Sequence, residues 1–564
     1  MNSDVDWASQ AKQFQQELGS QWARALQSFQ QVAVPTAASS LPSLTFSPDK
    51  LQELQQAYVR EASELWNAGL SDRPSPSDKR FANDAWSRNP VASFSAAVYL
   101  LNARTLLALA EAAETDTKTK ARLRFAVEQW MAASAPSNFM ALNAEAQQKA
   151  LETKGESIAR GVQNLLADLQ QGHVSMTDES AFEVGRNVAT TEGAVVFENE
   201  LFQLIEYKPL TKQVYERPYL VVPPCINKFY ILDLQPENSL VRYLSEQGHR
   251  TFVVSWRNPD ASLEGKTWDD YIGDGLLKAI EVTQDVANAK QINALGFCVG
   301  GTLLGTALAV LAARKEKPVA SATLLTTFLD FTDTGILDVF IDDAFVQFRE
   351  MQMGKGGLLK GQELASTFSF LRPNDLVWNY VVGNYLKGET PPPFDLLYWN
   401  SDSTNLPGPM YAWYLRNTYL ENNLVKPGQC TVCGEKVDLG KVDIPVFVYG
   451  SREDHIVPIA GAYASLKHLP GKKRFVMGAS GHIAGVINPP TKNKRSYWTN
   501  DKLPETYDEW LKGAKEHPGS WWPEWANWLK PHGGKQVPAP KTYGRGTKYK
   551  AIEPAPGRYV KAKA

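Results

Sequence analysis

The segment from Leu295 to Gly301 places the strongest constraint on the fold, because it has the pattern of a lipase-like nucleophile elbow. The short run Gln291–Leu295 predicts a buried strand, and Thr302–Ala313 predicts an apolar helix after it. Flanking glycines let a strand turn sharply into a helix, so the side chain of Cys298 stands at the helix N-terminus. There the unpaired amides and the helix dipole favour a thiolate. A cysteine at this position points to acyl transfer through a thioester rather than to simple ester hydrolysis.

The elbow alone leaves a second interpretation open. Free cysteine is among the most buried residue types, and a glycine–x–cysteine–x–glycine string also arises by chance. The acids and histidines elsewhere in the chain therefore decide whether Cys298 is catalytic or structural.

A hydrolase-type elbow requires an acid after a later strand and then a histidine. Asp443–Gly450 predicts a buried strand that Asp454 follows, and Lys473–Met477 predicts the next strand, which His482 follows. With only seven histidines in the chain, this order is not easily an accident. We therefore predict Cys298, Asp454 and His482 as the nucleophile, the acid and the base.

Three other residues compete for these roles. His455 is the alternative base, but it is adjacent to Asp454 and would point elsewhere, so we interpret it as a supporting group or a second base. Asp330 and Asp333 are alternative acids, because they follow the strand-like run 320–328. We favour Asp454 over both.

The loop after the predicted strand Tyr219–Val222 is the expected source of one oxyanion donor. In this architecture the residue after the nucleophile gives the other donor. These rules nominate the backbone amides of Ile226 and Val299. We interpret the neighbouring Cys225 as a small buried residue and not as a second nucleophile.

Length and composition set the outer limits. A chain of 564 residues is too long for one core, so we expect two or three domains. Lys and Arg (59) nearly balance Asp and Glu (61), so the charge gives no argument for nucleic acid. We expect no signal peptide and no transmembrane segment. Four cysteines give no disulfide framework, which fits the cytoplasm, and the pair Cys430 and Cys433 is interpreted as structural.

The sequence pattern divides the chain into three regions. Residues 1–200 are expected to form a mostly helical N-terminal domain, and residues 201–530 a catalytic domain in which strands alternate with helices. Residues 531–564 form a basic tail, which is either flexible or a binder of anionic surfaces; flexibility is the default. An amphipathic stripe near the N-terminus either packs on its own domain or contacts a partner helix or particle surface. The stripe consists of Trp7, Phe14, Leu18, Trp22, Leu26 and Phe29.

A long aromatic-rich insertion, at about residues 331–442, interrupts the predicted sheet. An insertion above the strand ends is typical of a lid that covers the nucleophile and excludes water. Many of its aromatic residues can equally form the core of the lid itself.

Several motifs resemble those of polyhydroxyalkanoate synthases, an α/β-hydrolase-fold family, over nearly the whole chain. They are Pro223–Leu234, the elbow, Tyr398-Trp399-Asn400, Asp454–Pro458, Gly481-His482 and Pro556–Ala564. The length and the Phe-Cys-Val elbow are similar to the class I enzymes, which act without a different partner subunit and prefer short-chain monomers.

The resemblance implies a function for this chain. Cys298, Asp454 and His482 would form the triad, with His455 and Trp399 supporting it or near the substrate. The substrate would be an (R)-3-hydroxyacyl-CoA, first of all 3-hydroxybutyryl-CoA, with CoA as product and no cofactor. The partners would be the growing polyester, a second copy of the chain in a homodimer, and granule-associated proteins. The location would be the surface of polyester inclusions in the cytoplasm.

Two other classes of function remain open at this stage. A cysteine-dependent thioesterase or small acyltransferase would share the triad but release a free acid or a single ester. A non-catalytic granule-surface protein would suit the amphipathic stripe. Polymer formation from hydroxyacyl-CoA, with CoA released without matching free acid, distinguishes a polymerase from these alternatives.

Overall fold

The computed structural model describes residues 45–68 and 78–564, which form two units. The N-terminal unit contains the described residues up to Val174 together with Arg372–Glu389. The catalytic unit contains Ser175–Leu371 and Thr390–Ala564. The predicted stripe from Trp7 to Phe29 lies outside the described residues.

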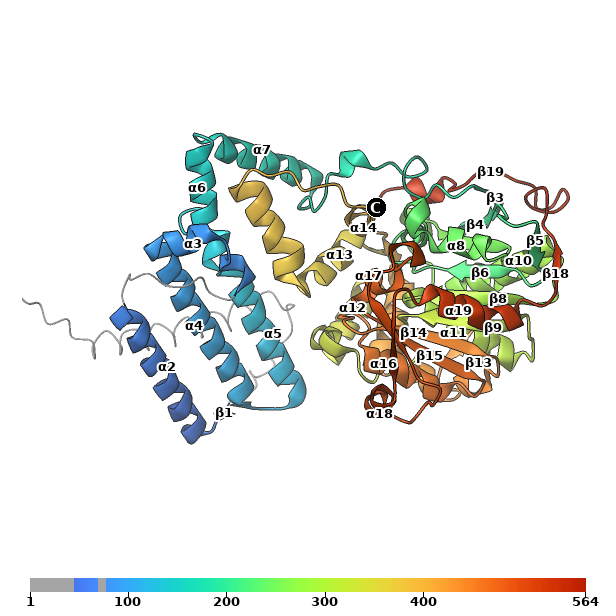
Figure 1. The fold of residues 1–564 in the computed structure, drawn as a ribbon. Helices are drawn as coiled ribbons and strands as arrows, with labels where there is room; N and C mark the ends of the chain where they lie inside the picture. The colour runs from blue at the N-terminus through green and yellow to red at the C-terminus, as the bar shows by residue number, and fades with distance from the viewer. Residues whose placement is uncertain (1–44, 69–77) are drawn as a thin grey trace, which may run out of the picture. The chain divides into compact units, whose positions relative to one another are not determined.

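The catalytic unit is built on one large mixed sheet (Figure 1). Its strand order is β17-β16-β15-β14-β9-β8-β6-β7-β4-β3-β19. The neighbours from β7 to β15 pair in parallel, and the strands at both edges are antiparallel. The strands are β3 (Gly193–Glu198), β4 (Phe202–Tyr207), β6 (Tyr219–Val222), β7 (Thr251–Trp256), β8 (Ile292–Phe297), β9 (Val319–Leu325), β14 (Val446–Ser451), β15 (Lys473–Gly478), β16 (Ser496–Thr499), β17 (Lys515–Pro518) and β19 (Glu553–Pro554).

Each central strand is buried on both faces, because helices cover both sides of the sheet. Alternate residues of β6 show this: Leu220 and Val222 belong to one hydrophobic cluster, whereas Tyr219 and Val221 belong to the other. The covering helices include α8 (Leu240–Glu246), α10 (Lys278–Ala287), α11 (Val299–Ala313), α16 (Ile459–Ala464) and α19 (Trp522–Leu529). The predicted α/β-hydrolase architecture is thus confirmed.

The predicted insertion lies between two strands that are neighbours in the sheet. Val446 of β14 pairs with Ala322 of β9, so the intervening chain leaves the sheet and returns to it. The insertion carries η8 (Gly335–Phe340), α12 (Asp343–Met353), α13 (Gly361–Phe370), η9 (Asn374–Trp378), η10 (Val381–Leu386), α14 (Asp395–Ser401), α15 (Gly408–Tyr414) and η11 (Leu415–Leu420).

The N-terminal unit is helical, as the sequence predicts. Its longer helices are α2 (Pro48–Ala68), α4 (Pro90–Ala112), α5 (Thr117–Ala133) and α7 (Glu156–Gln171), with the short helices α3 (Asp84–Arg88) and α6 (Ala144–Glu152). In the described part of the chain, α4 is the one helix whose length and apolar composition would let it cross a membrane. The sequence analysis predicted no such segment. The helix buries Ala96, Ala103 and Ala110 inside this unit, as a core helix does.

Part of the lid insertion belongs to the N-terminal unit, which the predicted boundaries did not include. Element η10 packs against α7 so closely that a Cβ atom on Gly161 would lie 2.0 Å from the carbonyl oxygen of Tyr385. The Tyr385 hydroxyl also donates a hydrogen bond to Asp168 at 2.6 Å. The unit therefore ends near residue 174 rather than 200, and it takes in Arg372–Glu389.

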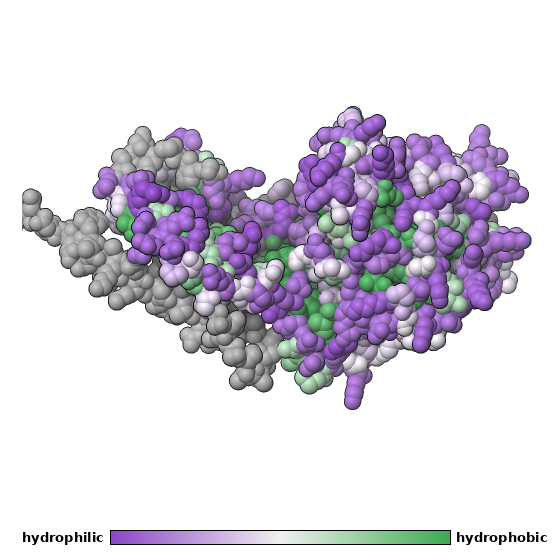
Figure 2. Space-filling model, turned by 90° about the horizontal axis from the view of Figure 1, so that it is seen from below, coloured by the Kyte–Doolittle hydropathy of each residue, from purple (hydrophilic) through white to green (hydrophobic). Residues whose placement is uncertain are grey.

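The basic C-terminal region is ordered on the catalytic unit, so the default prediction of a flexible tail is wrong. Strand β18 (Gln536–Pro538) pairs with β5 (Gln213–Tyr215), and β19 pairs with β3. The two-residue strand β19 thereby covers β3, which would otherwise be the edge strand of the large sheet. Polar side chains occupy most of the face in Figure 2, with small hydrophobic patches between them.

Candidate active site

The nucleophile elbow has the backbone geometry that the glycine pattern predicts. Cys298 lies between β8 and α11 with φ 53° and ψ −129°, a strained conformation for a residue with a side chain. A Cβ atom on Gly296 would lie 2.3 Å from the Cα atom of Gly301, and one on Gly300 would lie 2.3 Å from the carbonyl oxygen of Val222. These close approaches are the physical reason for the glycines, and Cys298 itself is half-buried.

Two hydrogen bonds fix the backbone of Cys298 to the neighbouring strand. Its amide donates to the carbonyl of Leu325 at 2.9 Å, and its carbonyl accepts from the hydroxyl of Thr327 at 3.1 Å. Val299 begins α11, where helical amides have no partner within the helix. Ile226 lies in the loop between β6 and η4 (Phe229–Leu232), as the sequence analysis expected of an oxyanion loop.

His482 and Asp454 come together from the ends of two adjacent strands. Asp454 follows β14, and His482 begins α17 (His482–Val486) after β15. Nδ1 of His482 lies 2.7 Å from Oδ2 of Asp454, and both side chains are buried. The ring of His482 also stacks on Phe297, the residue before Cys298, with centroids 5.7 Å apart. The structure thus places the predicted base beside the predicted nucleophile.

The electrostatics of the site favour a charged imidazole. Burial alone would lower the pKa of His482, but the charges of Asp454 and Cys298 and hydrogen bonds to both raise it to about 10. An imidazolium next to a thiol stabilises the thiolate form of that thiol. The arrangement therefore places a histidine within hydrogen-bonding reach of the Cys298 thiol.

The competing acids have other partners. Asp330 is buried after β9 and binds Nε2 of His468 at 2.8 Å and Nζ of Lys467 at 3.1 Å. Asp333 accepts a hydrogen bond from the amide of Gly335 and is exposed. Neither contact involves His482, so the geometry favours Asp454 as its partner.

His455 is half-buried in the turn after Asp454. The ring that binds Asp454 is that of His482. A supporting role for His455 stays a prediction.

Two lid tyrosines lie close enough to Cys298 for its charge to act on them. Burial is the largest cause of the raised pKa values of Tyr414 and Tyr419, and the charge of Cys298 contributes to both. Their rings pack edge to face at 5.5 Å and join the cluster of Phe328, Phe331 and Val457. Two aromatic side chains of the insertion therefore lie near the nucleophile.

Trp399 contacts the loop of Ile226 rather than the triad. Its indole N–H donates a hydrogen bond to the carbonyl of Lys228 at 2.7 Å, and its side chain is buried. The sequence analysis expected Trp399 to support the triad or to lie near the substrate, and this stays a prediction. The sequence analysis did not identify Lys228 as a functional residue, although this lysine lies in the motif from Pro223 to Leu234.

The remaining cysteines have separate surroundings. Burial raises the pKa of Cys225 to about 12 and those of Cys430 and Cys433 to about 11. The thiol of Cys430 points to Asn417, and that of Cys433 donates to the carbonyl of Asp269. Within residues 45–68 and 78–564, no group of three or more His, Cys, Asp or Glu residues could hold a metal ion.

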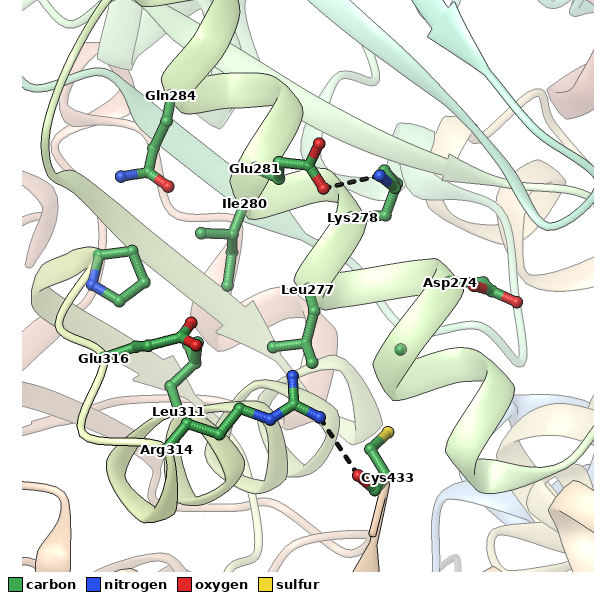
Figure 3. A pocket seen from close by; sticks show the side chains of 12 residues that line it. Asp274, Leu277, Lys278, Ile280, Glu281, Gln284, Leu311, Arg314, Glu316 and Cys433 are labelled. Carbon is green, nitrogen blue, oxygen red and sulfur yellow. Dashed lines mark hydrogen bonds and ion pairs between the residues drawn. The ribbon is translucent and has the colours of Figure 1, made fainter. Parts of the chain in front are cut away.

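Cys433 lines a surface pocket that is separate from the elbow (Figure 3). The pocket lies between η7 (Tyr271–Leu277), α10 and the C-terminal end of α11, where Arg314 bonds the carbonyl of Cys433. Cys298 directly precedes α11, whereas the pocket lies at the other end of this helix. Because an α-helix rises about 1.5 Å per residue, the pocket and the thiol lie roughly 20 Å apart. This pocket does not serve the nucleophile.

Comparisons with known proteins agree with the fold. Residues 77–244 match a family described as the N-terminus of poly-beta-hydroxybutyrate polymerase, and residues 218–489 match the alpha/beta hydrolase fold. The chain is 62% identical over 543 residues to a poly(3-hydroxyalkanoate) polymerase subunit of Cupriavidus necator, covering 94% of this chain and 92% of the relative. It is 42% identical to a poly(3-hydroxyalkanoate) polymerase of Methylorubrum extorquens, over 92% of this chain and 88% of that one.

Solved structures are more distant. An alpha/beta hydrolase fold protein from Chitinophaga pinensis is 15% identical, with a TM-score of 0.30, and covers 52% of this chain and 92% of its own. A monoacylglycerol lipase from Paleococcus ferrophilus is 13% identical, with a TM-score of 0.32, over 50% of this chain and 91% of its own.

Proposed function

This chain belongs to the poly(3-hydroxyalkanoate) polymerase family, and we propose that it builds its polyester through a thioester on Cys298. It is an acyltransferase that polymerises hydroxyacyl-CoA into polyhydroxyalkanoate. The observation that carries the proposal is the position of His482, which bonds Asp454 and interacts with the thiol of Cys298.

The first step of the proposed reaction acylates the enzyme. The thiolate of Cys298 attacks the carbonyl carbon of the substrate thioester, a carbon–sulfur bond forms, and the amides of Val299 and Ile226 stabilise the oxyanion. The bond to the sulfur of CoA then breaks, and His482 gives its proton to that sulfur. One thioester replaces another of similar energy, so the acyl group stays activated, which is the physical reason for sulfur instead of a serine oxygen.

The second step extends the polymer. The 3-hydroxyl of another hydroxyacyl unit attacks the acyl group on Cys298, and His482 accepts the hydroxyl proton. A carbon–oxygen bond forms and the bond to Cys298 breaks, which regenerates the thiolate beside the protonated His482. Asp454 either orients His482 or acts on the hydroxyl through it. Water competes for the same acyl group, so the partly buried Tyr414 and Tyr419 near Cys298 favour polymer over free acid.

The finer parts of the proposal rest on the class I resemblance. The substrate is an (R)-3-hydroxyacyl-CoA, first of all 3-hydroxybutyryl-CoA, and no cofactor takes part. The enzyme acts as a homodimer on the surface of cytoplasmic polyester inclusions, where granule-associated proteins are candidate partners.

Mass spectrometry after brief exposure to 3-hydroxybutyryl-CoA tests the proposal. We expect an acyl group on Cys298, with CoA released in excess of free 3-hydroxybutyrate. Cys298→Ala should abolish both, whereas Cys433→Ala, which removes a half-buried thiol outside the site, should polymerise normally. Full polymerisation by Cys298→Ala would overturn the proposal, and free acid equal to released CoA would indicate a thioesterase.

A further inference from the structure

Residues near the C-terminus of the sequence lie against the loop that carries Ile226. We call Tyr559–Lys563 the C-terminal strap. The carbonyl of Ala562 accepts a hydrogen bond from the ammonium of Lys228, and the carbonyl of Lys563 accepts one from the amide side chain of Asn258 at 2.7 Å. Both contacts lie within the catalytic unit. Hydrogen bonds to the backbone carbonyls of the strap therefore hold it in place, whatever its side-chain charges contribute.

Lys228 is unusual because it is a lysine with only 2% of its surface exposed, two residues after Ile226. A buried ammonium is costly unless hydrogen bonds and a counter-charge satisfy it. The carbonyl of Ala562 provides the hydrogen bond, and the nearby carboxylate of Asp402 favours the charged form. The backbone of Lys228 is fixed as well, because its carbonyl accepts from Trp399.

Asp402 joins this loop to the lid insertion. It lies directly after α14, is 4% exposed, and accepts a hydrogen bond from the hydroxyl of Tyr230 at 2.9 Å. It also pairs with the ammonium of Lys563 at 3.1 Å. Residues from the oxyanion loop, the lid insertion and the strap thus meet around one buried carboxylate.

We propose that Lys228 is a positioning residue, which holds the amide of Ile226 in place by tying its loop to the C-terminal strap. The inference rests on the proposed oxyanion role of Ile226. A donor that acts on a transition state must be held to about 0.5 Å, and an error of 1 Å can cost about 10²-fold in rate. The backbone of the loop between β6 and η4 pairs with the rest of the unit through an isolated bridge from Asn227 to Ser403, and side-chain anchors such as Lys228 add to its rigidity.

The test compares Lys228→Met, deletion of residues 562–564, and the combination of the two in the full-length chain. Methionine keeps the length of the side chain and removes its donor, and an apolar substitute for a buried charge is often tolerated. We expect each change to lower the rate of Cys298 acylation by about tenfold or more with KM within about twofold, because a transition-state donor is displaced. The combined variant should be no slower than the deletion alone, because the deletion already removes the partner of Lys228 together with two contacts of Lys563.

Matched variants separate positioning from general damage. Lys561→Ala removes an exposed charge from the same strap and should keep the wild-type rate. Trp399→Phe removes another anchor of the same loop and should also lower the rate with KM unchanged. If Lys228→Met fails to fold, the acylation rate of Trp399→Phe tests whether anchoring this loop matters for catalysis.

A wild-type acylation rate in Lys228→Met, a loss confined to KM, or rate losses that multiply in the combined variant would overturn the proposal. None of these results would affect the proposed thioester, which the acyl group on Cys298 of the wild-type enzyme and the activity of Cys298→Ala test separately.

Discussion

One carboxylate oxygen of Asp454 binds Nδ1 of His482, and the other accepts the amides of Ile456 and Val457 at 2.8 and 2.9 Å. The backbone therefore fixes the carboxylate before it contacts the ring. A carboxylate held this way sets the tautomer of the histidine and stabilises the imidazolium.

The first prediction concerns this carboxylate. Asp454→Asn should lower the rate of CoA release by about 10³-fold or more, because an amide nitrogen facing Nδ1 imposes the wrong tautomer on His482. Asp333→Asn is the control, since Asp333 is an exposed acid that the sequence also allowed. Steady-state release of CoA from 3-hydroxybutyryl-CoA measures both. A large loss in Asp333→Asn, or none in Asp454→Asn, would contradict the assignment.

The second prediction concerns pH. The pKa of His482 is raised to about 10 in the folded protein, above the value of about 6.5 in unfolded chains. Since the folded state binds this proton more tightly, the resulting stability is fully present below about pH 6.5 and is lost as pH rises towards 10. In Cys298→Ala the pKa should fall, because one charge that raises it is absent.

Carbon-13-labelled histidine provides the measurement. The chain has seven histidines, so the spectrum is simple, and His482→Gln identifies the resonance. We expect the titration of His482 to move to lower pH in Cys298→Ala, and the loss of stability on raising the pH to be smaller and to be complete at a lower pH. An unchanged titration would show that the thiol does not share a charge interaction with this ring.

The third prediction concerns the elbow. Gly300→Ala places a Cβ atom 2.3 Å from the carbonyl oxygen of Val222, which requires the start of α11 or the oxyanion loop to move. We expect a loss of about 1–3 kcal/mol of stability, as in overpacked cores, and at least about a tenfold loss of rate. Gly265→Ala is the control, because nothing lies within 4 Å of its added atom. Thermal unfolding and acylation kinetics measure the two effects, and equal behaviour of both variants would refute the steric argument.

Local patterns predicted the catalytic unit well. The elbow, the alternation of strands and helices, and the strands before Asp454 and His482 depend on neighbouring residues, so they are readable from the sequence. The choice between Asp454 and Asp330 was less secure, because both follow strands of the same sheet. Only the positions of His482 and His468 separate them.

Two features had no local signal. Lys228 and Ala562 are far apart in the sequence, and a basic region rich in proline and glycine has the composition of a flexible tail, although its strands pair with β5 and β3. The grouping of Arg372–Glu389 with the N-terminal helices is likewise a packing contact between distant segments. Such contacts depend on the fit of surfaces, and a single sequence does not encode that fit as a pattern.

The fourth prediction tests this last contact. The contacts that hold the segment against α7 include the close approach at Gly161, the bond between Tyr385 and Asp168, and the hydrogen bond from Asn164 to the carbonyl of Asn384 at 3.0 Å. Gly161→Ala should force α7 and η10 apart, because the obstacle is the backbone oxygen of Tyr385, which cannot rotate away.

Hydrogen exchange followed by mass spectrometry measures the effect within the intact chain. The amides of residues 372–389 should exchange about tenfold faster or more in Gly161→Ala, since overpacking of about 1–3 kcal/mol promotes local opening. Val162→Ala alters the adjacent, 52% exposed position and should leave exchange unchanged. If Gly161→Ala protects this segment as well as the wild type does, the segment is not held by α7. Faster exchange there, with amides around Cys298 unaffected, would show that this part of the lid insertion is stabilised by the N-terminal unit.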